Sequence, residues 1–137
     1  MYARFGHTFT MVRILKRRDF ARWQASEGLP DALLCKAIEE LERGLIDADL
    51  GGLLYKVRIA RPSGGKSGGY RTLLSASIGR RCVFLHGFAK NDKANISKDE
   101  KSALQFAGKV FLELSGEALA KALQSGVLVE VDCEQDH

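Results

Sequence analysis

Hydrophobic residues recur at helical spacing near the start of the chain. A helix is predicted over Lys16–Ser26, with Gly28 and Pro30 as its stop. A second helix begins at Pro30 or Asp31. Its apolar side chains fall three or four residues apart, at Leu34, Ile38, Leu41 and Leu45. Charged residues take most of the opposite face, which is typical of a helix that packs along one side.

The last third of the chain predicts two more helices. Ser97 begins a long one, with Glu100 three residues later as its capping-box partner. Four apolar residues line one stripe of this helix, Ala103, Phe106, Val110 and Leu114. A short helix then runs to Gln124, and a last apolar run follows over Val127–Val131.

Between these helical regions the hydrophobic period changes to two, which is typical of strands. Three strands are predicted here and one before them, at Leu53–Arg61, Tyr70–Ile78, Arg81–Phe88 and Phe9–Leu15. Gly79–Arg80 has the composition of a hairpin turn. This order of elements predicts an α+β fold, with helices packed on a mostly antiparallel sheet.

Length and composition suit one domain. The chain has 137 residues, of which 45% are hydrophobic and 28% charged, and we expect residues 1–137 to form a single unit. Met11 offers an alternative start, which would make residues 1–10 a dispensable extension. The spacing of Cys35, Cys82 and Cys133 fits neither a zinc site nor a redox pair. We therefore expect reduced thiols, no metal and a cytoplasmic location.

Charge is spread unevenly along the chain. Residues 1–49 are neutral overall, residues 50–91 carry +8 and residues 92–137 carry −4. The middle segment contains no carboxylate and eight cations, Lys56, Arg58, Arg61, Lys66, Arg71, Arg80, Arg81 and Lys90. Like charges repel, so a fold that gathers them usually has an anion to place there. A phosphate, and first of all a nucleic acid, is the expected partner.

Three of these cations are predicted to meet. Lys56 and Arg58 are two apart on one strand, so they leave the same face, and Arg71 joins them if the next strand pairs alongside. A solvated sheet face is the alternative interpretation, but the segment holds no acid to pair with them, which favours a phosphate site. The nearby run Ala60–Ser67 (ARPSGGKS) is close to a P-loop. It lacks the first glycine, and a strand rather than a helix follows, so nucleotide hydrolysis is not favoured.

Three further residues have open roles. Lys66, in a glycine-rich loop, could close over a phosphate backbone or be an ordinary loop lysine. Tyr70 could stack on a base or line the edge of the core. His86 shares a predicted strand face with Phe84 and Phe88, where it could act as an acid or base or simply be packed.

Two runs carry a resemblance to a known family. GLIDADLGGLLYKVRIARPSGGKSGGYRTLL (Gly44–Leu74) and VFLHGFAKNDKANIS (Val83–Ser97) resemble the RelE/HigB-like toxins of type II toxin–antitoxin modules. The nearest branch is the HigB-like one with a GKSGGYR loop, and the resemblance extends from about Val12 to Val131. It implies a small α+β domain with two N-terminal helices on an antiparallel sheet. This chain adds C-terminal helices and a last short strand.

The resemblance also implies an activity. RelE members cut mRNA in the ribosomal A site by attack of a ribose 2′-hydroxyl on the adjacent phosphate, without a metal or other cofactor. Basic side chains stabilise the charge that develops on the phosphoryl oxygens. The catalytic positions carried over in this way are Lys56, Arg58, Arg71 and Lys90. The expected RNA-binding positions are Arg61, Lys66, Tyr70 and His86.

Individual roles follow from the same resemblance. Lys56 would take the 2′-hydroxyl proton, while Arg58 and Arg71 clamp the phosphate. Repulsion from the two arginines favours loss of a proton from the lysine. The C-terminal catalytic tyrosine of RelE has no counterpart here, so the general acid is unassigned, with His86 and Tyr70 as candidates.

The expected partners are mRNA, the ribosome and a cognate antitoxin encoded beside the toxin. Antitoxins of this branch typically carry a helix-turn-helix domain, and operator DNA would be bound only through them. No membrane is expected. Two other functions stay open. One is a ParE-like toxin that binds gyrase, although such toxins generally lack the basic cluster; the other is a non-catalytic RNA- or ribosome-binding module.

Overall fold

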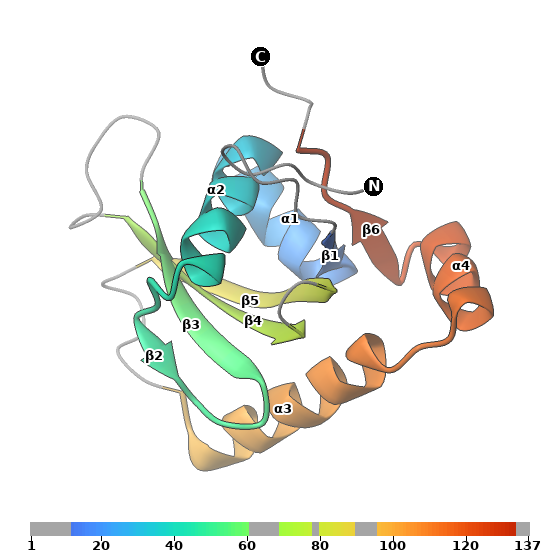
Figure 1. The fold of residues 1–137 in the computed structure, drawn as a ribbon. Coiled ribbons are helices and arrows are strands. Elements are labelled where there is room, and N and C mark those ends of the chain that lie inside the picture. Colours follow the sequence, from blue (N-terminus) through green and yellow to red (C-terminus); the bar gives the residue numbers. More distant parts are fainter. Residues whose placement is uncertain (1–11, 61–68, 78–79, 90–95, 134–137) are drawn as a thin grey trace.

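The computed structural model describes residues 12–60, 69–77, 80–89 and 96–133. This part of the chain forms four helices and one six-stranded sheet (Figure 1). In chain order the elements are β1 (Arg13–Arg17), α1 (Arg18–Ser26), α2 (Asp31–Glu42), β2 (Ala48–Asp49), β3 (Leu54–Ile59), β4 (Tyr70–Ser77), β5 (Arg81–Ala89), α3 (Lys98–Leu112), α4 (Gly116–Ser125) and β6 (Leu128–Glu130). The predicted α+β class is confirmed.

The strands are ordered β2-β3-β4-β5-β1-β6. All neighbours are antiparallel except β1 and β5, which run parallel. The first predicted helix begins two residues too early, because Lys16 and Arg17 still belong to β1. Lys16 lies opposite Phe84 of β5 on one side and Val129 of β6 on the other, and this pairing holds the backbone extended.

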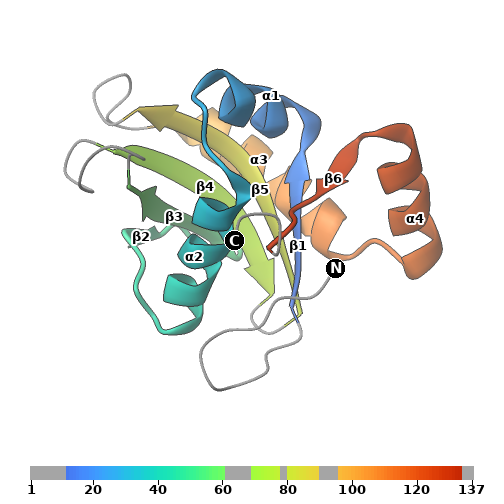
Figure 2. The same ribbon diagram turned by 90° about the horizontal axis from the view of Figure 1, so that it is seen from above.

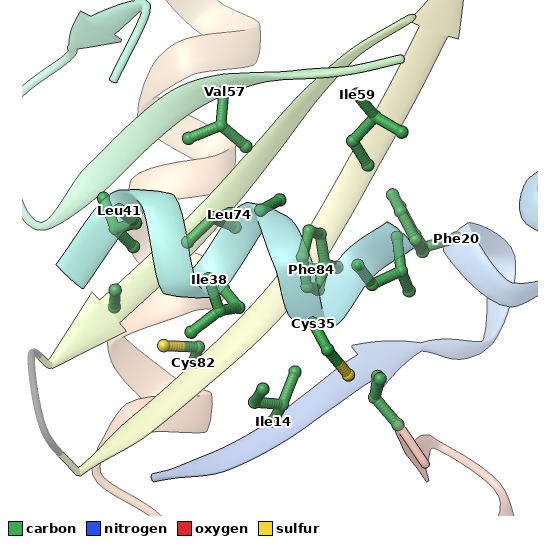
Figure 3. Packing of buried hydrophobic residues seen from close by; sticks show 14 of the residues in the cluster. Ile14, Phe20, Cys35, Ile38, Leu41, Val57, Ile59, Leu74, Cys82 and Phe84 are labelled. Carbon is green, nitrogen blue, oxygen red and sulfur yellow. The ribbon is translucent and has the colours of Figure 1, made fainter. Parts of the chain in front are cut away.

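Helices cover both faces of the sheet (Figure 2). Under α1 and α2, side chains such as Phe20, Ile38, Leu74 and Phe84 are fully or almost fully buried (Figure 3). A second cluster fills the face toward α3 and α4, with Leu15, Leu73, Leu85, Leu104 and Leu119. The central strands are therefore buried on both faces, and every residue of β4 before Ser77 is buried.

A buried ion pair fastens the layer of α1 and α2. Lys16 Nζ lies 2.8 Å from Asp31 Oδ1 and donates to Gln24 Oε1 at 2.7 Å. Asp31 also accepts from the backbone N–H of Asp132, at 2.9 Å. Burial alone would raise the pKa of Asp31, but the hydrogen bonds from Asp132, Gln24 and Lys16 outweigh it and hold that pKa below its ordinary value.

The predicted start of the long C-terminal helix is confirmed. Ser97 accepts a hydrogen bond from the backbone N–H of Glu100 at 3.0 Å, and the Glu100 side chain accepts from the Ser97 N–H at 2.9 Å. These two bonds satisfy donors that a helix start leaves without helical partners. The next helix, α4, begins in a related way at Ser115 and ends at Gly126, whose φ of 82° suits glycine.

The predicted apolar stripe of α3 is not its buried face. Phe106 is 72% exposed and Val110 42% exposed, whereas the helix meets the sheet through Leu104 and Gly108. A Cβ on Gly108 would lie 1.7 Å from Oγ of Ser75 on β4. Packing through a glycine brings the helix close to the sheet, while Phe106 and Val110 stay on its outer side.

The prediction of three reduced thiols is wrong for two of them. Cys35 in α2 and Cys133, after β6, form a disulfide with a Cα–Cα distance of 5.7 Å, although 98 positions separate them in sequence. Cys82 of β5 is a free, buried thiol, and burial raises its pKa to about 12. The disulfide attaches the segment after the last strand to the layer of α1 and α2.

Candidate functional site: a cationic sheet face

The three central cations of the sequence do meet. Lys56 and Arg58 are two residues apart on β3, and Arg71 of β4 lies directly opposite Arg58 in the antiparallel register. Their neighbours Val57 and Ile59 enter the core under α1 and α2, so the cations occupy the other face, on the side of α3. The predicted grouping of Lys56, Arg58 and Arg71 is confirmed.

A carboxylate that the sequence interpretation missed lies among them. Asp47 Oδ1 accepts from Arg58 Nε at 3.0 Å, and Asp47 Oδ2 lies 3.5 Å from Arg71 Nε and 3.6 Å from Lys56 Nζ. The expectation that these cations have no acid to pair with is therefore wrong. Asp47 precedes the carboxylate-free segment by three positions, and the pairing of β2 with β3 brings it beside Lys56. Asp47 does lie within Gly44–Leu74, one of the two runs that carry the family resemblance.

The electrostatics of this group follow from partial burial. Burial would raise the pKa of Asp47, but the hydrogen bond from Arg58 and the charges of Arg58, Lys56 and Arg71 hold it below its ordinary value. Asp47 is thus ionised at neutral pH, and three cations around one anion leave a net charge of about +2. The Arg71 side chain is 10% exposed, that of Lys56 23% and that of Arg58 50%. Arg71 is thus fixed within the sheet, and Arg58 reaches into solvent.

His86 and Phe88 of β5 form the neighbouring part of the same face. A β-bulge shifts the register, so that Leu73 lies opposite His86 but Leu74 lies opposite Phe84. The rings of His86 and Phe88 lie 5.8 Å apart, whereas Phe84 packs on Phe20 in the other core. The predicted face with both phenylalanines is therefore wrong for Phe84, because the extra residue in the bulge reverses the alternation.

Tyr70 lies on the opposite face from the cations. Its hydroxyl donates to Glu27 Oε1 at 2.9 Å, and its ring meets Trp23 edge-on at 5.5 Å. The side chain is almost completely buried. Of the two interpretations of Tyr70, the structure supports the core edge rather than a platform for a base.

Other predicted positions lie outside the described residues. The structure does not describe Arg61, Lys66 or Lys90, nor most of the run that resembles a P-loop. The element after that run is the strand β4, and not the helix that a P-loop needs, as predicted.

A small cavity adjoins the cations near the start of α3. It has a volume of about 300 Å³, and Leu73 and Phe88 line it together with Lys56. Lys98 and Lys101, from the first turn of α3, line it as well. These two lysines were missed because they come from the acidic last third of the sequence, which α3 brings back to the sheet. We use the name cationic face for Asp47, Lys56, Arg58, Arg71, His86, Lys98 and Lys101.

Chemically, this surface suits a phosphate group. Two guanidinium groups and the ammonium group of Lys56 surround an anionic position that Asp47 now fills, and arginine forks match phosphate oxygens. Within the described ranges, no three His, Cys, Asp or Glu side chains gather as metal ligands would. No helix among those residues is long and apolar enough to cross a bilayer.

The fold and this surface define a small α+β domain with one sheet face arranged for an anion. A family described as the RelE toxin of the RelE/RelB toxin–antitoxin system matches residues 12–131. The chain belongs to this RelE family and is the toxin of a toxin–antitoxin pair. A search of curated proteins found no significant relative.

Proposed function

We propose that this toxin is a ribosome-dependent mRNA endonuclease. The observation that carries the proposal is the convergence of Lys56, Arg58 and Arg71 on one sheet face of a RelE-family chain. These cations suit the phosphate of a single RNA strand. The GKSGGYR run resembles that of the HigB-like branch of such toxins, and the proposal assigns the chain to that branch.

The proposed reaction transfers the phosphoryl group within the RNA. Lys56, in its neutral amine form, accepts the proton of a ribose 2′-hydroxyl, and the 2′-oxygen attacks the adjacent phosphorus. The bond to the 5′-oxygen of the next nucleotide breaks, which leaves a 2′,3′-cyclic phosphate and a 5′-hydroxyl. Arg58 and Arg71 hold the non-bridging oxygens, where negative charge grows in the transition state. No metal or other cofactor takes part.

His86 is the proposed general acid. It lies in the same row of the sheet as Lys56, with Leu73 between them, so base and acid face the phosphate from two sides. A histidine can give a proton to the leaving 5′-oxygen near neutral pH. Tyr70, the other sequence candidate, points into the opposite core and takes no part.

Asp47 has a positioning role in this scheme. It holds Lys56, Arg58 and Arg71 together before RNA arrives, which reduces their mutual repulsion. The phosphate of the bound message then replaces the carboxylate as their counter-ion. Lys98, Lys101 and the predicted contacts Arg61, Lys66 and Lys90 hold neighbouring phosphates. The toxin works in the cytoplasm, where a helix-turn-helix antitoxin inhibits it and carries any operator binding.

Primer extension on a translated reporter mRNA tests the proposal. Wild-type toxin should give new 5′ ends within the reading frame only when ribosomes are present. Arg58→Ala should cut about 10²-fold more slowly, because a donor to the transition state is lost. Half-exposed Arg58 can be removed with little cost to the fold, and Arg22→Ala, at an exposed arginine of α1, is the matched control.

Two results would contradict this function. If the folded wild type binds RNA in a salt-sensitive way but leaves mRNA intact, the protein is a non-catalytic RNA-binding module. If cells that express it keep their mRNA intact but show DNA damage, the protein is a toxin that acts on gyrase.

A further inference from the structure

A large groove lies at the other end of α3 from the small cavity beside Lys56. Its volume is about 1110 Å³. Side chains of the second half of α3 form one wall, and the turn between β2 and β3 and the paired ends of β4 and β5 form others. Figure 1 shows that turn beside α3, with α4 beyond the C-terminal end of α3. The groove shares no lining residue with the cationic face.

Apolar side chains are exposed in this groove. Phe106 is 72% exposed and Leu53 is 49% exposed, and both line it. Val110, one helical turn after Phe106, is 42% exposed and extends the apolar surface. A group of large, exposed apolar side chains marks a surface that another molecule covers.

The backbone conformation of Leu53 also supports a built, exposed apolar surface. Its φ of 64° makes it the one described non-glycine residue with a positive φ, a strained conformation for leucine. Gln105 Nε2 donates to the carbonyl oxygens of Leu50 and Gly51, both at 3.1 Å, and so attaches this turn to α3. The turn is thus fixed in a conformation that holds a leucine side chain half in solvent.

The rim of the groove is cationic. Arg80 and Lys109 are exposed, and among the described residues that line the groove Glu113 is the one carboxylate. Arg81 instead supports the wall, because it donates to the carbonyl oxygens of Phe111, Leu112 and Leu114 at the end of α3. An apolar floor with a basic rim complements a segment that is apolar on one side and acidic on the other.

We infer that this groove binds an acidic amphipathic segment of the cognate antitoxin. The inference rests on the proposed toxin function, to which it adds the docking surface. Apolar side chains of the segment cover Phe106 and Leu53, and its carboxylates meet Arg80 and Lys109. A second copy of the toxin fits worse, because a twofold contact through this face would bring Arg80 and Lys109 toward their own copies. Docking here leaves the cationic face to be covered by another part of the antitoxin or to stay open.

Calorimetric titration of the protein encoded beside this chain into purified toxin tests the docking. Phe106→Asp should weaken binding by at least about tenfold, since it removes an apolar contact and adds a repelling charge. Lys109→Glu should weaken binding by about fivefold, and its effect should shrink in high salt. Leu45→Asp is the matched control, because Leu45 is 56% exposed and lies outside the groove. Circular dichroism checks that each variant is folded.

Each alternative result has a distinct meaning. Equal affinity for the wild type, Phe106→Asp and Leu45→Asp would overturn the docking site, as would a wild type that does not bind. A toxin dimer that Phe106→Asp disrupts, with antitoxin affinity unchanged, would make a second copy the occupant. Binding that depends on Phe106 in a protein that leaves translated mRNA intact would overturn the endonuclease and keep the docking site.

Discussion

The two faces of the sheet differ in how completely they are covered. Under α1 and α2, the large side chains Phe20, Ile38 and Phe84 are sealed, and an ion pair and a disulfide reinforce the layer. On the other face, α3 buries only two of its own residues, Leu104 and Gly108. That face carries the cations, the small cavity and the groove. Both sides of the sheet hold a hydrophobic core, but the side of α3 also leaves surface available to partners.

The largest expected effect compares a phenylalanine from each face. Phe84→Ala should lower the free energy of unfolding by about 3–5 kcal/mol, because it opens a cavity in a closed core. Phe106→Ala should change it by no more than about 0.5 kcal/mol, since that ring is mostly in solvent. Urea unfolding followed by circular dichroism measures both. Similar losses for the two variants would mean that the faces are equally packed.

The next effect concerns the disulfide. Reduction should lower the free energy of unfolding by about 2–4 kcal/mol, because the Cys35–Cys133 bond closes a long loop in the unfolded chain. Thermal unfolding with and without a reductant measures it. The double variant Cys35→Ser, Cys133→Ser is the control, and the reductant should leave it unchanged. Equal stability of the oxidised and reduced wild type would show that the disulfide adds nothing to the packing and the ion pair that hold this layer.

A smaller loss of stability than that from reduction is expected on the cationic face. Asp47→Asn should lower the free energy of unfolding at pH 7 by about 1 kcal/mol, since the pairs it loses are partly open to solvent. The pKa of Asp47 is lower in the folded state than in the unfolded state, where it is about 4. The stabilisation by Asp47 is therefore fully present above about pH 4 and is lost as the pH falls through the folded-state pKa. The difference from the wild type should therefore close under acid conditions.

The same substitution should strengthen RNA binding. Removing the carboxylate raises the local charge by one, so affinity for a short single-stranded RNA should rise, with a salt dependence steeper by about 0.7. Fluorescence anisotropy at several salt concentrations measures both quantities. Weaker binding by Asp47→Asn would mean that Asp47 also orients the cations in the complex.

Local signals in the sequence predicted most of the elements. The capping box at Ser97 depends on neighbours three residues apart, and the alternation in β3 shows directly in the pattern. The features that failed depend on contacts distant in sequence. Phe106 was assigned to an apolar stripe because the pattern does not reveal that Gly108 makes the close approach to Ser75.

The candidate site shows the same limit. Lys56, Arg58 and Arg71 could be grouped because adjacent strands of a hairpin usually pair. Asp47 could not be placed, since its position depends on the short pairing of β2 with β3. The bulge that turns His86 toward the cations leaves no mark in an alternating pattern.

The position of β1 has a consequence for how the toxin is made. This strand lies between β5 and β6, and Leu15 pairs with Glu130, near the other end of the described chain. A nascent chain leaves the ribosome N-terminus first. Strand β1 is therefore made early, but both its neighbours exist only when almost the whole domain has been synthesised. The sheet that supports the cations is complete only late in synthesis. Any activity that needs this sheet is therefore delayed until most of the domain has been synthesised.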